Sequence, residues 1–306
     1  MKRTIPLFLM ILILVLTVAG PIMGCSPGED NPGNPDSLQK ERFLEIMSAI
    51  NINTVDDIGT WGLILVDIQA SLSLDKRLGI ETTSNNGGLV NEFYNELCIA
   101  VGIKPQDLAS YAIIYPNLPY FLLGEFNLDD TRSHLSEMDF QRDDREGIEV
   151  WWSDYDAWVV LYGNLIIFGE DSYHDQSSEW CIRALTGEDK SLDEDPYFSN
   201  IIYDFPSVVS YSFYPVNQQY DEDCKLSADL MVVQGEIVKY MMVGVYTDSA
   251  AAMRTIERYG DDIREAAEEL GESAGPDVKT EWYQSNQYIV IVAEVGFDQY
   301  RSLMAP

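Results

Sequence analysis

One stretch of the chain has the residue pattern of a serine-hydrolase nucleophile, because Gly271, Ser273 and Gly275 form a G-x-S-x-G motif. That motif needs a strand before the serine and a helix after it. Here the hydrophobic periodicity predicts the reverse order, a helix before Ser273 and a strand after it. The hydrolases also place their histidine after the serine, whereas His134 and His174, the two histidines of this chain, precede it. We therefore expect a helix C-terminus at Ser273, and we predict no catalytic residue.

Acidic runs at Asp193–Asp195 and Asp221–Asp223 could supply oxygen ligands to calcium. Neither run has the alternating ligands, the central glycine and the final glutamate of an EF-hand loop. The two histidines lie outside any HExxH motif, and we expect both at the surface. No Walker A or GxGxxG sequence occurs. We predict no metal site and no cofactor.

Paired carboxylates could also hydrolyse glycosidic bonds, but such pairs are always findable among 51 acidic residues. Only an exposed cleft that holds two carboxyls of raised pKa would favour this chemistry. An acid-based cell-envelope hydrolase therefore stays an alternative, as does a calcium-dependent adhesion element.

Trp151 and Trp152 are the candidate binding aromatic residues. Adjacent residues of a strand point to opposite faces of its sheet. We expect one ring in the core and the other either exposed or covered by a helix. Packing of both rings in the core is the favoured interpretation, and an exposed ring would be a candidate ligand platform.

The N-terminus is built like a signal peptide for export. Lys2 and Arg3 precede an uncharged apolar run over residues 5–19, and small Gly24 stands directly before Cys25. This ending resembles the lipobox of bacterial lipoproteins. The resemblance implies that residues 1–24 are removed and that Cys25 carries a diacylglycerol lipid. An uncleaved membrane-spanning helix is the alternative, although spanning needs about 20 apolar residues.

Residues 25–36 are predicted to be a tether, because they are rich in proline, glycine and short polar side chains. As a flexible coil the tether would reach roughly 18 Å. The folded part is therefore expected on the extracytoplasmic face of a bacterial membrane, held by the lipid on Cys25. Its ligand or partner protein is not specified by any motif.

The charge of the chain is strongly acidic. Removal of residues 1–24 takes away Lys2 and Arg3 and no acid, which leaves 17 basic and 51 acidic residues and a formal net charge of −34. Phosphate contacts require clustered Lys and Arg, so we expect no nucleic-acid partner. The dispersed acids are typical of a solvated, self-repelling surface.

Three cysteines follow Cys25 in the sequence, at Cys98, Cys181 and Cys224. They permit at most one intramolecular disulfide, and their spacing matches no zinc pattern. Cys98 and Cys181 fall on apolar faces of predicted helices, so buried thiols are expected there. Whether a disulfide forms is left open by the sequence.

The folded part is predicted to be α+β, with duplicated β-β-α-β-β units that form antiparallel sheets with helices packed on one face. The first half is placed at residues 37–200 and the second at 201–306. Tyr120–Asn127 can be overlaid on Tyr240–Thr247, and Trp152–Leu161 on Trp282–Ile291. In the second half the pattern predicts the following strands and helix: Val208–Tyr214, Leu226–Val233, Glu236–Tyr246, a helix capped by Thr247 or Ser249 and running to Leu270, Val278–Tyr283 and Gln287–Val295.

The order of elements also resembles an uncharacterised family of bacterial exported and membrane-anchored proteins. The resemblance lies in Phe43–Ile46 before a strand that ends at Asp67, and in the stretch from Ala184 to Phe198. It implies no catalytic residue. The sequence therefore predicts a membrane-anchored, non-catalytic module that binds a ligand or protein or scaffolds the envelope.

Overall fold

The computed structural model describes residues 35–52, 62–78, 97–115, 119–154, 157–170, 177–205, 208–215, 223–275 and 278–304. Cys25, the predicted signal peptide, nearly all of the predicted tether and His174 lie outside the described residues, as do Asp221 and Glu222. In the part that the structure describes, no helix is long and apolar enough to cross a membrane.

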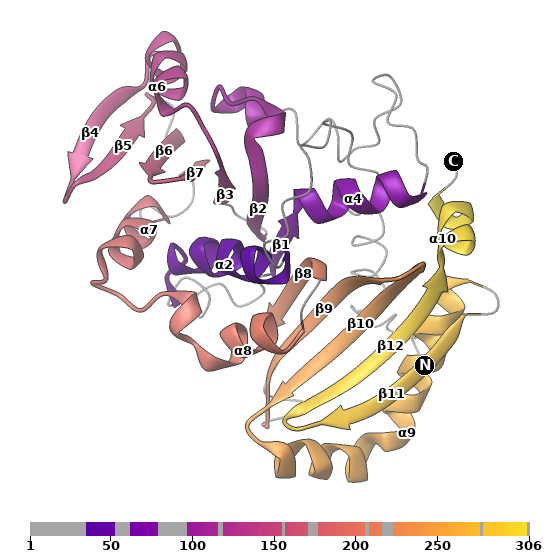
Figure 1. The fold of residues 1–306 in the computed structure, drawn as a ribbon. Helices are drawn as coiled ribbons and strands as arrows, with labels where there is room; N and C mark the ends of the chain where they lie inside the picture. Colours follow the sequence, from indigo (N-terminus) through magenta and orange to yellow (C-terminus); the bar gives the residue numbers. More distant parts are fainter. Residues whose placement is uncertain are drawn as a thin grey trace, which may run out of the picture.

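The described strands form one antiparallel sheet of twelve strands (Figure 1). Their order across the sheet is β11-β12-β10-β9-β8-β1-β2-β3-β7-β6-β5-β4. The α+β class is therefore confirmed. The strands are β1 (Gly62–Asp67), β2 (Leu108–Tyr115), β3 (Tyr120–Gly124), β4 (Gln141–Arg145), β5 (Ile148–Trp152), β6 (Ala157–Tyr162), β7 (Leu165–Glu170), β8 (Val208–Pro215), β9 (Cys224–Gln234), β10 (Ile237–Tyr246), β11 (Lys279–Ser285) and β12 (Tyr288–Gly296).

Two groups of helices pack against this sheet, one group on each face. The first face carries α2 (Pro35–Ser48), α7 (Ser177–Thr186) and α8 (Pro196–Asp204). The second face carries α4 (Ile68–Leu78), α6 (Leu128–Glu137), α9 (Ser249–Ala274) and α10 (Phe297–Met304).

The sequence predicted helices on one face of the sheet. This prediction is wrong, because helices cover both faces. Strand β1 gives the physical reason, because its side chains are buried on both sides. Leu63 and Leu65 lie in the apolar cluster of the first face, whereas Ile64 and Val66 lie in a cluster of the second. A strand that is apolar on both sides must be covered on both sides.

The sheet runs continuously through both predicted halves. Its order reads outward from the β1–β8 pair, as β1-β2-β3-β7-β6-β5-β4 in one direction and β8-β9-β10-β12-β11 in the other. The second half has the predicted order of strands and helix, whereas the first half carries four strands after α6 instead of two. The predicted boundary at residue 200 lies inside α8. The duplication itself stays a prediction.

Two elements near the candidate sites were not predicted from the sequence. Strand β4 is polar throughout, and it forms as an edge strand that pairs with β5 across a turn at Glu146 and Gly147, both at positive φ. Helix α4 follows β1 directly, because the Asp67 side chain accepts a hydrogen bond from the Ala70 amide at 2.8 Å and caps the helix. Hydrophobic periodicity signals neither a polar edge strand nor a helix that begins where a strand ends.

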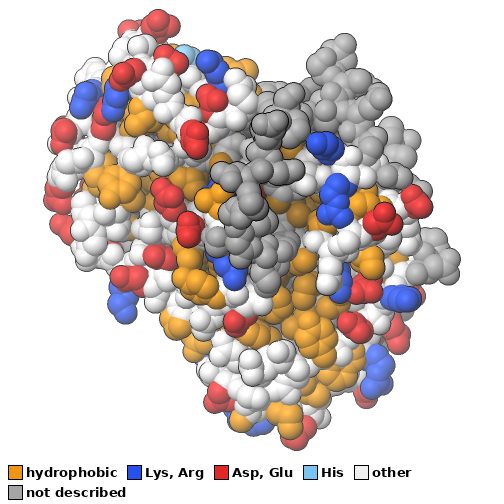
Figure 2. All heavy atoms as spheres, in the orientation of Figure 1, with side chains coloured by type: hydrophobic (Ala, Val, Ile, Leu, Met, Phe, Trp, Pro, Cys, Tyr) orange, Lys and Arg blue, Asp and Glu red, His pale blue; other side chains and the backbone are white. Residues whose placement is uncertain are grey.

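The visible face of the molecule carries acidic side chains that are scattered between apolar patches, with few Lys and Arg (Figure 2). This distribution agrees with the dispersed acids of the sequence.

Candidate functional site

The G-x-S-x-G motif lies at the end of a helix. Helix α9 continues to Ala274, past the predicted end at Leu270, and Gly275 caps it with a φ of 112°. Ser273 is exposed in the last helical turn, and β11 follows. The predicted order, with a helix before Ser273 and a strand after it, is confirmed, whereas the helix ends four residues later than predicted. The start of the helix differs from the prediction, because Asp248 rather than Thr247 or Ser249 caps it.

The described members of the acidic runs take part in local structure. Asp193 accepts a hydrogen bond from the Ser191 hydroxyl at 2.5 Å, and Asp195 caps α8 by accepting from the Tyr197 amide at 2.7 Å. Asp223 forms an ion pair with Arg254 at 2.8 Å. Within the described residues, no group of three or more His, Cys, Asp or Glu side chains could hold a metal ion.

His134 is only half-exposed, although a surface position was expected. It packs against Gly102, where a Cβ atom would lie 2.5 Å from the His134 Cβ. Its Nε2 is buried without a hydrogen-bond partner among the described residues. His134 is therefore a packing residue of α6.

The cysteines that follow Cys25 are core groups. Cys98, Cys181 and Cys224 are buried, each in a different apolar cluster, and none of them forms a disulfide within the described chain. Burial is the first cause that raises the pKa of the Cys98 thiol, to about 12, and the charge of Asp107 adds to it. The prediction of buried thiols at Cys98 and Cys181 is confirmed.

The two candidate aromatic residues do point to opposite faces, but neither offers an open ring. Trp151 is 5% exposed in the cluster under α6, and Trp152 is half-buried on the other face. The guanidinium of Arg145 lies 4.9 Å from the centre of the Trp152 ring. Core packing, the favoured interpretation, describes both rings better than a ligand platform does.

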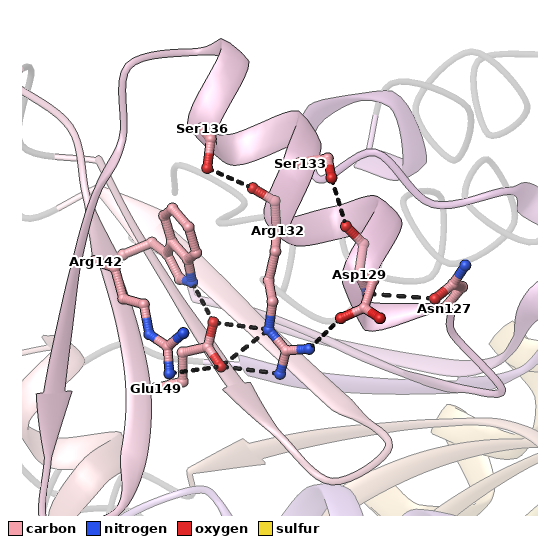
Figure 3. A network of polar contacts seen from close by, with 8 residues as sticks. Asn127, Asp129, Arg132, Ser133, Ser136, Arg142 and Glu149 are labelled. Atoms are coloured by element: carbon pink, nitrogen blue, oxygen red, sulfur yellow. Dashed lines mark hydrogen bonds and ion pairs between the residues drawn. The ribbon is translucent and has the colours of Figure 1, made fainter.

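Trp151 belongs to a polar network between α6 and β5 (Figure 3). The Glu149 carboxylate accepts hydrogen bonds from the Trp151 indole at 2.9 Å and from Nε and Nη2 of Arg132, and Arg142 lies within 3.6 Å. Burial alone would raise the pKa of Glu149, but the hydrogen bonds and the positive charges lower it. Asp129 pairs with the same Arg132 at 2.8 Å. Every charge of the network has a partner, so it serves to clamp α6 onto the sheet.

A different set of polar side chains, Ser212, Tyr214, Ser227 and Asp229, lies on the neighbouring strands β8 and β9, on the face that also carries α4 and α9. We call it the polar strip. Strand pairing places Ser212, Asp229 and Met242 in one row across three strands, and Tyr214, Ser227 and Gly244 in the next row. The members of the strip are half-buried, except for Ser212, which is 3% exposed. The sheet thus keeps hydrogen-bonding groups and partial solvent access on interior strands.

Apolar residues continue the first row on both sides. Ile64 pairs with Ser212, and Ile291 pairs with Met242; these two isoleucines are 9% and 8% exposed. A carboxyl in the middle of such a row is unfavourable for stability unless something hydrogen-bonds to it. Packing of the sheet alone therefore does not explain why polar residues occupy the strip.

Asp229 is the electrostatic centre of the strip. Its Oδ1 is buried without a hydrogen-bond partner among the described residues, and burial raises the pKa of its carboxyl to about 7. Near it, the hydroxyls of Tyr214 and Ser212 form a hydrogen bond. Burial is the largest cause that raises the pKa of Tyr214, and the charge of Asp229 is the second. The strip can therefore exchange a proton near neutral pH and can accept hydrogen bonds from a bound group.

A second carboxyl of raised pKa lies on the same face, at Asp75 of α4. It is 7% exposed, its Oδ2 has no hydrogen-bond partner among the described residues, and burial raises its pKa to about 7. Its charge acts on Tyr300 of α10, whose hydroxyl lies 4.0 Å from the Met231 sulfur. Asp75 is enclosed between helices and the sheet, so it does not face a ligand.

The polar strip was not predicted from the sequence. Its signal is the period-two alternation over residues 210–214 and 227–231, where polar and apolar side chains take turns. This alternation predicts a polar face, but it does not show which strands lie beside each other.

Comparison with known proteins gives only a distant likeness. No family model and no curated protein matches this chain. Crystal structures of TP0453 are similar to it at 8% sequence identity: crystal form I has a TM-score of 0.43 and form IV one of 0.40, each covering 85% of this chain and 96% of that chain.

Proposed function

We propose that this protein is a lipid-anchored, extracytoplasmic and non-catalytic module that binds a small-molecule or protein ligand close to a membrane. The observation that carries the binding role is the polar strip, in which a carboxyl oxygen of Asp229, on an interior strand of the sheet, has no hydrogen-bond partner among the described residues. The lipobox resemblance at Cys25 and the tether after it support the membrane location. A tether of about this length would keep the strip within tens of ångströms of the lipid.

The hydrolase alternative is supported less well. Hydrolysis by paired carboxylates requires two acidic groups on either side of an accessible bond. Asp75 and Asp229 both have a raised pKa, but Asp75 is enclosed at 7% exposure. Asp229 is half-buried in the strip, and one such carboxyl fits binding better than it fits acid–base hydrolysis.

Two measurements on protein from the native host test this proposal. Intact-mass analysis should show that residues 1–24 are absent and that Cys25 carries lipid, and Cys25→Ser should abolish the mass increase. A photo-crosslinking amino acid at Ser227 should capture a ligand or partner in the envelope, whereas the same group at exposed Asp261 should not capture it. An unmodified Cys25 would disprove the anchor, and equal capture at both positions would disprove the binding role of the strip.

A further inference from the structure

We propose that the polar strip binds a small organic cation, whose ammonium group forms an ion pair with Asp229. This inference rests on the proposed function, because it assumes that the strip is a binding surface. It adds the chemical class of the ligand.

The position of Asp229 favours the binding of a hydrogen-bond donor. The carboxyl stands between Ser212 and Met242 in a row that ends in apolar residues on both sides. Its Oδ1 has no partner among the described residues, and a buried acceptor without a hydrogen bond is unfavourable for stability. An ammonium group would supply charge-assisted hydrogen bonds, which are stronger than neutral ones.

No positively charged side chain of the described residues pairs with Asp229, so we assign the pairing cation to a ligand. No ion pair involves Asp229 among the described residues, and burial is the sole cause of its raised pKa. Lys225 lies four residues along β9, about 13 Å away at the rise of a strand. Arg77 of α4 is held elsewhere, by the Gly235 carbonyl and over the Phe297 ring.

The other charged groups of the neighbouring elements do not neutralise Asp229 either. Asp75 of α4 carries the same sign, and Lys239 of β10 pairs with Glu294 at 2.7 Å. Arg254 of α9 pairs with Asp223. With a formal net charge of −32 the whole chain attracts cations, so electrostatic steering favours the same ligand class.

The remaining side chains of the strip suit an organic cation better than a metal ion. Calcium takes six to eight oxygen ligands, and the strip offers one carboxylate and a few hydroxyls. Tyr214 provides a ring next to Asp229, and aromatic faces attract ammonium groups. The Met242 side chain offers an apolar surface for the carbon chain of a ligand, whereas the Tyr246 ring covers the backbone at Gly244.

Isothermal titration with 1,5-diaminopentane tests the inference, with 1,5-pentanediol as the neutral ligand of the same length. The diamine should bind and the diol should not. Asp229→Asn should weaken diamine binding at least tenfold, whereas Asp261→Asn, which removes the same charge at an exposed position, should leave it within about twofold. Circular dichroism and thermal melting of both variants show whether each is folded.

The pH dependence gives a second readout. An ammonium ion must displace the proton of Asp229, whose pKa is about 7, so affinity should rise about tenfold from about pH 6 to pH 8 at constant ionic strength. Asp229→Asn should remove this dependence. Equal binding of diamine and diol, equal effects of the two substitutions, or no diamine binding would each overturn the cation inference. Crosslinking through Ser227 would still decide the binding role of the strip independently.

Discussion

Replacement of Asp75 by asparagine should make the protein more stable at neutral and alkaline pH. The Asp75 carboxyl is 7% exposed on α4, and its Oδ2 has no hydrogen-bond partner among the described residues. Burial raises the pKa of this group from 3.8 to about 7. Asparagine has nearly the same shape as the protonated acid, and it carries no charge at any pH, so Asp75→Asn removes the ionisation while it keeps the packing.

The size of the effect follows from the pKa difference between the folded and unfolded states. A raised folded pKa means that the contribution of Asp75 to stability is fully present below about pH 3.8 and is lost as the pH rises through about 7. About three pKa units at 1.36 kcal/mol each give a loss of about 4 kcal/mol as an upper bound. Domains have a free energy of unfolding of about 5–15 kcal/mol, so this loss is large.

Urea denaturation at about pH 4 and about pH 8 measures the effect. The variant should match the parent protein at the lower pH and should exceed it by about 2–4 kcal/mol at the higher pH. Asp229 titrates in both proteins, so its share of the pH dependence cancels in the difference. Asp261→Asn, at a side chain that is 95% exposed, is the control and should change neither value. If the difference between variant and parent is the same at both pH values, the burial argument for Asp75 is refuted.

Three further predictions concern the packing of the sheet. Arg132→Met should lower the free energy of unfolding, measured in urea at neutral pH, by about 1–3 kcal/mol. The loss should shrink at acidic pH, because the lowered pKa of Glu149 stabilises the folded state only while that carboxyl is ionised. An unchanged stability would contradict the role of this network in clamping α6 onto the sheet. Trp158→Ala should cost about 3–5 kcal/mol, since its ring is fully buried, and a loss below about 1 kcal/mol would show that the site is not packed. In thermal melting, Gly102→Ala should destabilise the protein more than Gly163→Ala. Both positions have positive φ, but only at Gly102 would the new Cβ overlap a neighbouring side chain, that of His134. Equal effects of the two substitutions would argue against the close approach of His134 to Gly102.

Much of the second half could be predicted from the sequence. Alternating and apolar runs gave strands close to β8, β9, β10, β11 and β12, and the long amphipathic stretch gave α9. The opposite orientation of Trp151 and Trp152 also followed from strand geometry alone. These features are local, because the period of side chains along a strand or helix depends only on neighbouring residues.

The arrangement of helices and the candidate site depended on contacts between distant residues. Whether α4 and α9 share a face of the sheet, and whether Asp229 lies beside Ser212 and Met242, is decided by strand pairing and register. A shift of one residue would turn the side chain of Asp229 to the other face. The sequence by itself determined that β9 has a polar and an apolar side. Only the tertiary structure decided that the polar side lies between apolar neighbours on an interior strand of a twelve-stranded sheet, because register is fixed by the burial of both faces together.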